Sequence, residues 1–196
     1  MQSPYNKQRV YLVRHGETEW SVSGRHTGLT DVPLTEHGRE EAQRLAPVLQ
    51  VQRFEDVLVS PLERAKQTCA LAGFAAHASM DADLCELNYG AYEGMTPREI
   101  HELAPNWLLF RDGCPGGESP DEVWDRVDRV IARVRAIPGD VALFAHGHIL
   151  RALGARWIGL AVVDGRRFRL DPATLCVLSY YHGLPAIERW NDHIER

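Results

Sequence analysis

The fold class follows from the stretch Val10-Tyr11-Leu12-Val13-Arg14-His15-Gly16 near the beginning of the sequence. Its first four residues form a short apolar run that predicts a buried strand, and this strand ends abruptly at the polar residues that follow. The same pattern recurs in Val57-Leu58-Val59 before Ser60, and in Val141–Ala145 before His146. The sequence therefore predicts at least three buried strands that end at polar residues.

Helices are predicted between these strands. Thr35 can cap a helix that runs to about residue 50, and Ser60 can cap a second one, with Pro61 at its first position. Further helices are predicted after Ser119 and after residue 146, a short strand near Leu84, and a closing pair of strands at 177–181 and 186–190. This alternation predicts an α/β fold with a central, mostly parallel sheet flanked by helices on both faces.

The composition is that of a globular protein, and we expect a single domain over residues 1–196. The core of this domain is expected at about 9–190, and residues 91–120 are expected to form an excursion on the substrate side. Apolar residues make up 44% and charged residues 25%. A net charge of −5 without a basic run argues against nonspecific nucleic-acid binding. The sequence shows no membrane span, no signal-peptide core near its start and no CxxC pair. We expect a soluble cytoplasmic protein without a membrane partner, and a homodimer is one option for its oligomeric state.

Three predicted strand ends carry the candidate functional residues: Arg14-His15-Gly16, Ser60 to Arg64, and His146-Gly147-His148. Ligands of open parallel sheets bind beyond the carboxyl ends of the strands, so these segments are expected to meet at one edge. Guanidinium groups and helix N-termini favour a phosphate dianion, and a neutral imidazole can attack phosphorus. A leaving alkoxide needs a proton, for which Glu86 is a candidate, although spacing alone does not distinguish it from other acids.

The sequence resembles the histidine phosphatase superfamily, also called phosphoglycerate mutase-like, from about Arg9 to Trp190. Three segments in the family's order carry the resemblance: Arg14-His15-Gly16-Glu17-Thr18, Ser60-Pro61-Leu62-Glu63-Arg64-Ala65-Lys66-Gln67-Thr68 and Ala145-His146-Gly147-His148. Members of the family have a central sheet flanked by helices, with the site at the C-terminal ends of the strands. This agrees with the argument from the strand ends.

The resemblance implies a role for each matching residue. His15 would be the nucleophile that becomes phosphohistidine, and Arg14, Arg64 and His146 would complete the phosphate pocket. Glu86 would be the proton donor, and it would later activate the water that hydrolyses phosphohistidine. This chemistry requires no metal and no other cofactor.

Further residues are expected to bind the substrate, a small phosphate ester. Ser21 stands where many members have Asn, and its shorter hydroxyl can still donate to a phosphate oxygen. Thr27 and Gly28 match the family's following loop, which can present a hydroxyl or an amide to the phosphate, and the Gly147 backbone lies close by.

Two aromatic residues have alternative interpretations. Tyr89 either contacts the substrate or packs in the core. His148 either faces the substrate or hydrogen-bonds a residue that does, and the second is favoured. The His146-x-His148 spacing also suggests metal ligation superficially, but no carboxylate motif joins the two, so no metal site is predicted.

The sequence favours hydrolysis over mutase chemistry. Related mutases usually carry extra loops that close the site, and an Arg-His pair where this chain has Leu87-Asn88. Two branches of the family, the sedoheptulose-1,7-bisphosphatases and the bacterial broad-specificity acid phosphatases, are resembled by further segments: Trp20-Ser21, Arg111-Asp112-Gly113-Cys114, Gly117-Glu118-Ser119, Phe144-Ala145-His146-Gly147-His148 and Val177-Leu178-Ser179-Tyr180. We therefore predict a metal-independent phosphomonoesterase acting on sugar phosphates or on a broad range of phosphate esters. The alternatives are a cofactor-dependent phosphoglycerate mutase and a non-catalytic protein that binds phosphorylated ligands.

Overall fold

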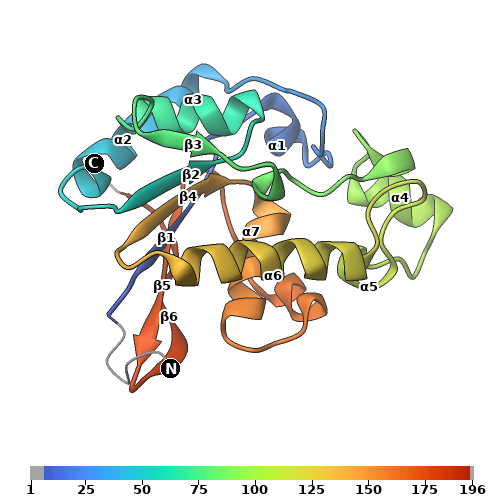
Figure 1. Cartoon of the computed structure of the whole chain (residues 1–196). Coiled ribbons are helices and arrows are strands. Elements are labelled where there is room, and N and C mark those ends of the chain that lie inside the picture. The colour runs from blue at the N-terminus through green and yellow to red at the C-terminus, as the bar shows by residue number, and fades with distance from the viewer. Residues whose placement is uncertain (1–6, 195–196) are drawn as a thin grey trace.

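Six strands form one sheet in the order β3-β2-β4-β1-β5-β6 in the computed structural model, which describes residues 7–194 (Figure 1). The strands are β1 (Val10–Arg14), β2 (Asp56–Val59), β3 (Ala78–Met80), β4 (Val141–Ala145), β5 (Leu175–Tyr181) and β6 (Leu184–Asp192). Strands β1 to β4 are parallel, whereas β5 is antiparallel to both β1 and β6. The predicted mostly parallel sheet is confirmed.

The register of the central strands brings the predicted strand ends together. Arg14 of β1 pairs with Ala145 of β4, and Val59 of β2 pairs with Phe144 of β4. The ladder continues one step past β1, where the backbone N–H of His15 donates to the Ala145 carbonyl over 3.0 Å. Because these strands end level with one another, the polar residues that follow them lie at the same edge of the sheet.

Helices cover both faces of the sheet, as predicted (Figure 1). Helices α2 (Glu36–Leu49) and α3 (Glu63–Leu71) pack on one face, and α6 (Pro120–Ala136) and α7 (Gly147–Trp157) pack on the other. Alternate residues of β1 belong to the two hydrophobic clusters, as expected for a strand buried on both sides. The shorter helices are α1 (Glu19–Ser23), α4 (Pro97–Leu103), α5 (Leu109–Asp112), η1 (Ala82–Leu84), η2 (Gly90–Tyr92) and η3 (Val162–Arg167).

Two predictions about local structure are wrong. Ser60 does not cap α3, which begins at Glu63, because its hydroxyl lies 2.7 Å from Nε2 of His146 instead. No strand lies at Leu84: this residue ends η1, and β3 precedes it at Ala78–Met80. Leu84 is fully buried, so its apolar character reflects its place in the core and does not indicate a strand.

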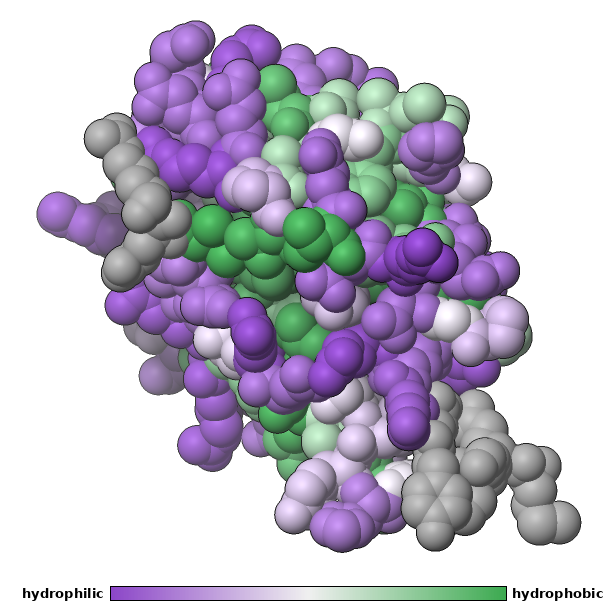
Figure 2. Space-filling model, turned by 90° about the vertical axis from the view of Figure 1, so that its left-hand side faces the viewer, coloured by the Kyte–Doolittle hydropathy of each residue, from purple (hydrophilic) through white to green (hydrophobic). Residues whose placement is uncertain are grey.

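The face of the molecule shown in Figure 2 is largely hydrophilic. On the face shown in Figure 2, hydrophobic residues gather in a central band and polar residues surround them. Within residues 7–194, no helix has both the length and the apolar character needed to cross a bilayer. The two hydrophobic clusters of the core lie between the sheet and its two helical layers.

Candidate active site

A cavity of ≈ 200 Å³ opens at the edge where β1 and β4 end. Its lining includes eight residues selected from the sequence: Arg14, His15, Ser21, Thr27, Glu86, Tyr89, Gly147 and His148. It also includes six that sequence reasoning missed: Gly24, Arg25, His26, Pro97, Arg151 and Leu170. The fold thus gathers cationic, imidazole and carboxylate groups from distant parts of the chain around one cavity.

His15 lies directly after β1 and is 4% exposed. Its Nδ1 lies 2.7 Å from the Gly16 carbonyl, which can only accept, so Nδ1 carries the proton and Nε2 keeps its lone pair. Burial, above all, and the positive charges of Arg14 and Arg64 lower the pKa of His15 well below its ordinary value. The imidazole is therefore neutral at physiological pH, with an unprotonated ring nitrogen available as a nucleophile.

Arg14 ends β1 and lines the cavity beside His15. Its Nη1 donates to the Leu170 carbonyl, which fixes the guanidinium, while its buried Nε has no hydrogen-bond partner among the residues described. A Cβ at Gly147 would lie 3.3 Å from the guanidinium carbon, so the glycine allows close packing of Arg14 on the start of α7. Arg14 can therefore offer a donor to an anion in the cavity.

Arg64 and His146 are fully buried and neither lines the cavity. Arg64 Nε donates to His146 Nδ1 over 3.1 Å, so the proton of this neutral imidazole sits on Nε2 and is donated to the Ser60 hydroxyl. Arg64 also donates to the carbonyls of Thr27, Gly28 and Thr30. The charge of Arg64 thus lies near the cavity, while most of its donors hold the loop at residues 27–30.

Glu86 is 4% exposed, and backbone amides bind its carboxylate. Oε1 accepts from Leu87 and Ile149 over 3.0 and 2.9 Å, and Oε2 accepts from His148 over 2.9 Å. Two of these donors are at the N-terminus of α7, where amides and the helix dipole favour an anion. Burial is the largest single influence and raises the pKa of Glu86, but the hydrogen bonds from His148 and the electrostatic interactions with His148 and His146 together outweigh burial and hold the pKa well below its ordinary value.

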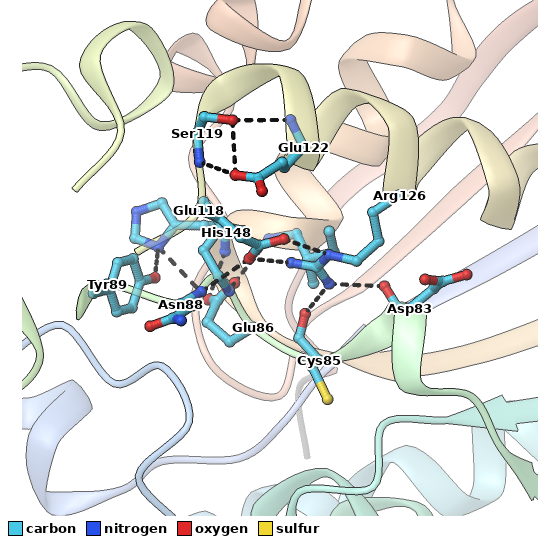
Figure 3. A network of polar contacts seen from close by, with 12 residues as sticks. Asp83, Cys85, Glu86, Asn88, Tyr89, Glu118, Ser119, Glu122, Arg126 and His148 are labelled. Carbon is cyan, nitrogen blue, oxygen red and sulfur yellow. Dashed lines mark hydrogen bonds and ion pairs between the residues drawn. The ribbon is translucent and has the colours of Figure 1, made fainter. Parts of the chain in front are cut away.

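His148 and Tyr89 lie beside Glu86 (Figure 3). The Tyr89 hydroxyl is 2.6 Å from His148 Nδ1, and this nitrogen is 3.6 Å from Glu86 Oε2. Burial lowers the pKa of His148 to about 4, despite the nearby carboxylate of Glu86. Both side chains line the cavity and also bind each other. Each residue can therefore face a substrate while it also takes part in contacts within the protein.

Ser21, Thr27 and Gly28, which the sequence also predicts to bind the substrate, form hydrogen bonds to other groups of the protein. The Ser21 hydroxyl donates to the Thr18 carbonyl over 2.8 Å and accepts from the Thr18 amide, although Ser21 lines the cavity. The Thr27 hydroxyl donates to a backbone carbonyl. The Gly28 amide donates to the Glu93 carboxylate over 2.9 Å, and Gly28 does not line the cavity. The sequence did not indicate any of these hydrogen bonds.

Two of the missed residues had a signal in the sequence. His26 directly precedes the loop residues Thr27 and Gly28, and its ring lies parallel to that of His148 with centroids 5.8 Å apart. Arg151 follows His148 by three residues on α7, which places both on one face of the helix. Its position beside the Thr27-Gly28 loop could thus have identified His26, and helical spacing from His148 could have identified Arg151.

The buried histidines make the fold sensitive to acid. His15 and His146 have pKa values well below that of an unfolded histidine, near 6.5, mainly because of burial. Below about pH 6.5 the unfolded chain binds protons that the folded chain does not, so each histidine costs about 1.4 kcal/mol of stability per pH unit. We expect the free energy of unfolding in urea to fall between pH 6.5 and pH 5, and His146→Asn to reduce that slope. A free energy of unfolding that is constant over this range would contradict these pKa directions.

Comparison with known proteins gives relatives over most of the chain. Residues 10–193 match the model of the histidine phosphatase superfamily (branch 1). An acid phosphatase of Mycobacterium tuberculosis is 39% identical over 90% of this chain and 88% of its own length. Sedoheptulose 1,7-bisphosphatase of Saccharomyces cerevisiae is 38% identical over 79% of this chain and 69% of its own. A protein named probable phosphoglycerate mutase GpmB, of Escherichia coli, is 31% identical over 93% of this chain and 89% of its own.

The family model covers nearly all of the described chain, and it includes the strand ends that form the cavity. The two relatives of highest identity given above are phosphatases by name. The chain is a phosphatase, and it belongs to the histidine phosphatase superfamily.

Proposed function

We propose that this phosphatase hydrolyses phosphomonoesters of sugars through a phosphohistidine formed on His15. The observation that carries the proposal is the state of His15: a buried, neutral imidazole with its Nε2 lone pair free, beside Arg14 and in the same cavity as Glu86. A nucleophile, a fixed cation and a carboxyl group in one cavity are the groups that phosphoryl transfer from an ester requires.

In the first step, His15 Nε2 attacks phosphorus and forms an N–P bond while the bond from phosphorus to the ester oxygen breaks. Glu86 gives its proton to that oxygen, so the product leaves as an alcohol. Arg14, and the charge of Arg64 that also acts on His15, stabilise the negative charge on the phosphoryl oxygens. The hydrogen bonds to Glu86 favour its ionised form, whereas the negative charge of a bound phosphate favours the protonated acid.

In the second step, water attacks the phosphorus of phosphohistidine. The Glu86 carboxylate, now ionised, accepts a proton from this water. The N–P bond breaks, inorganic phosphate leaves, and His15 recovers its lone pair. The two steps together consume one water and return every group to its starting state.

The wider lining of the cavity supports a polar organic substrate. Arg25, His26 and Arg151 lie in the cavity wall in addition to the groups assigned to the phosphate. Arg151 donates one hydrogen bond to the Gly165 carbonyl and has no carboxylate partner among the residues described. Such groups suit the hydroxyls or the second phosphate of a sugar phosphate. The relatives named acid phosphatase and sedoheptulose 1,7-bisphosphatase point the same way.

A panel of esters tests this proposal. We expect phosphate release in excess EDTA from fructose and sedoheptulose bisphosphates and from p-nitrophenyl phosphate, because no proposed step uses a metal. Interconversion of 3- and 2-phosphoglycerate faster than phosphate release would instead favour the mutase. Tight binding of an ester without turnover would favour a binding protein. A cytoplasmic location and the absence of nucleic-acid or membrane partners stay predictions from the sequence.

A further inference from the structure

The segment Asp83–Gly90 carries Glu86 and Tyr89 to the cavity but has little regular structure. It joins η1 to η2, and residues 85–89 belong to no helix or strand. An irregular segment has no ladder of its own hydrogen bonds, so contacts with other elements must satisfy its backbone. The position of the Glu86 carboxylate therefore depends on the groups that bind this backbone.

Arg126 and Glu118 bind this backbone from α6 and the residues just before it (Figure 3). Arg126 Nη1 donates to the carbonyls of Asp83 and Cys85 over 2.9 and 2.6 Å. Glu118 Oε2 accepts from the Asn88 amide over 2.9 Å, and the Glu118 amide donates to the Asn88 carbonyl over 2.9 Å. These contacts hold the segment on both sides of Glu86.

The two side chains form one fixed unit. Arg126 Nε and Nη2 each donate to a different Glu118 oxygen over 2.8 Å, and the side chains are only 10% and 20% exposed. Such a two-bond pair fixes orientation as well as distance. Ser119, the next residue after Glu118, caps α6 through a capping box with Glu122, which anchors this end of the unit.

We propose that Arg126 and Glu118 are positioning residues for the proton transfer by Glu86. Neither lines the cavity, so they act through the Asp83–Asn88 backbone and not on the substrate. A buried ion pair adds little net stability, because desolvation of its charges offsets their attraction, so a purely stabilising role does not account for it. The inference rests on the proposed function, in which Glu86 is the proton donor.

Esters with different leaving groups separate positioning from general support of the fold. Cleavage of the P–O bond of a sugar phosphate needs a general acid, because an alkoxide is a poor leaving group. p-Nitrophenolate is a good leaving group and departs without protonation. We expect Arg126→Met to lower kcat/KM for the sugar phosphate by about 10- to 100-fold, as for a displaced catalytic group, and to change p-nitrophenyl phosphate far less. kcat/KM reports transfer to His15, so hydrolysis of phosphohistidine does not affect this comparison.

A second variant and a double variant complete the test. Glu118→Gln keeps an acceptor for the Asn88 amide but removes the charge, and it carries the test if Arg126→Met does not fold. We expect it to show the same preference between esters, and Arg126→Lys to restore part of the activity. In the Glu86→Gln background, Arg126→Met should cause no further loss for the sugar phosphate, since both changes act on one group.

The control is the two-bond pair between Arg156 of α7 and Asp128 of α6, with both distances 3.0 Å. It joins α7 to α6 without touching the Glu86 segment, so we expect Arg156→Met to leave the ratio of the two esters unchanged. Equal losses of kcat/KM on both esters in Arg126→Met, or additive losses in the double variant, would overturn the inference about Arg126 and Glu118 and leave the proposed role of Glu86 intact. If Glu86→Gln itself affects both esters equally, the proposed role of Glu86 fails first and the inference fails with it.

Discussion

Replacement of His15 by alanine is expected to abolish turnover, with kcat lower by at least about 10⁴-fold, because it removes the nucleophile that forms the covalent intermediate. Buried neutral His146 is not a substitute, since both of its ring nitrogens are bound within the protein. Rapid quenching of the wild-type enzyme should trap a phosphorylated peptide that contains His15, stable in alkali and labile in acid.

The control for this experiment is His77→Ala, which changes an exposed histidine on the connection between α3 and β3. It should keep full activity and the trapped phosphopeptide. Substantial phosphate release by His15→Ala, or a phosphoryl group trapped on another residue, would contradict the assignment of the nucleophile.

Replacement of Glu86 by glutamine is expected to lower kcat/KM for sugar phosphates by about 10²- to 10⁴-fold, the usual contribution of a general acid. Glutamine keeps the size of the side chain and an acceptor for the amides of Leu87 and Ile149, but it cannot give a proton to the leaving oxygen. Kinetics on a sugar phosphate and on p-nitrophenyl phosphate check this result, and the second ester should lose much less.

The pH profile gives an independent check on the same residue. The lowered pKa of Glu86 means that its protonated fraction, and with it the rate on sugar phosphates, falls as pH rises through neutrality. The lowered pKa of His15 keeps the nucleophile neutral into the weakly acidic range, so the optimum should lie on the acid side of neutral. Glu86→Gln should flatten the alkaline limb. A wild-type profile that is already flat from pH 5 to pH 9 would count against both roles.

The sequence predicted the sheet well because its central strands are buried on both faces and therefore appear as continuous apolar runs, as in Val141–Ala145. It predicted which strand ends meet, since parallel strands end at a common edge. It did not predict the local structure at Ser60 or Leu84, where a tertiary hydrogen bond and burial in the core override the local pattern.

The same limit applies to the site. Motifs selected His15 and Glu86. They did not show that the Gly28 amide donates to Glu93, or that most N–H groups of Arg64 donate to backbone carbonyls. Such pairings depend on how loops from distant parts of the chain pack. Arg126 carries no motif of its own, and only the folded structure shows its contact with the segment of Glu86.

The central position of β1 determines when the catalytic centre can form during synthesis. Its neighbours are β4 and β5, and Arg14 binds the carbonyl of Leu170, 156 residues further along the chain. His15 therefore leaves the ribosome long before either neighbouring strand exists, and β1 must wait unpaired while most of the chain is translated. Pairing over such long separations makes folding slow. Phosphatase activity consequently arises only late in translation, and a nascent chain released early carries the nucleophile without the pocket that activates it.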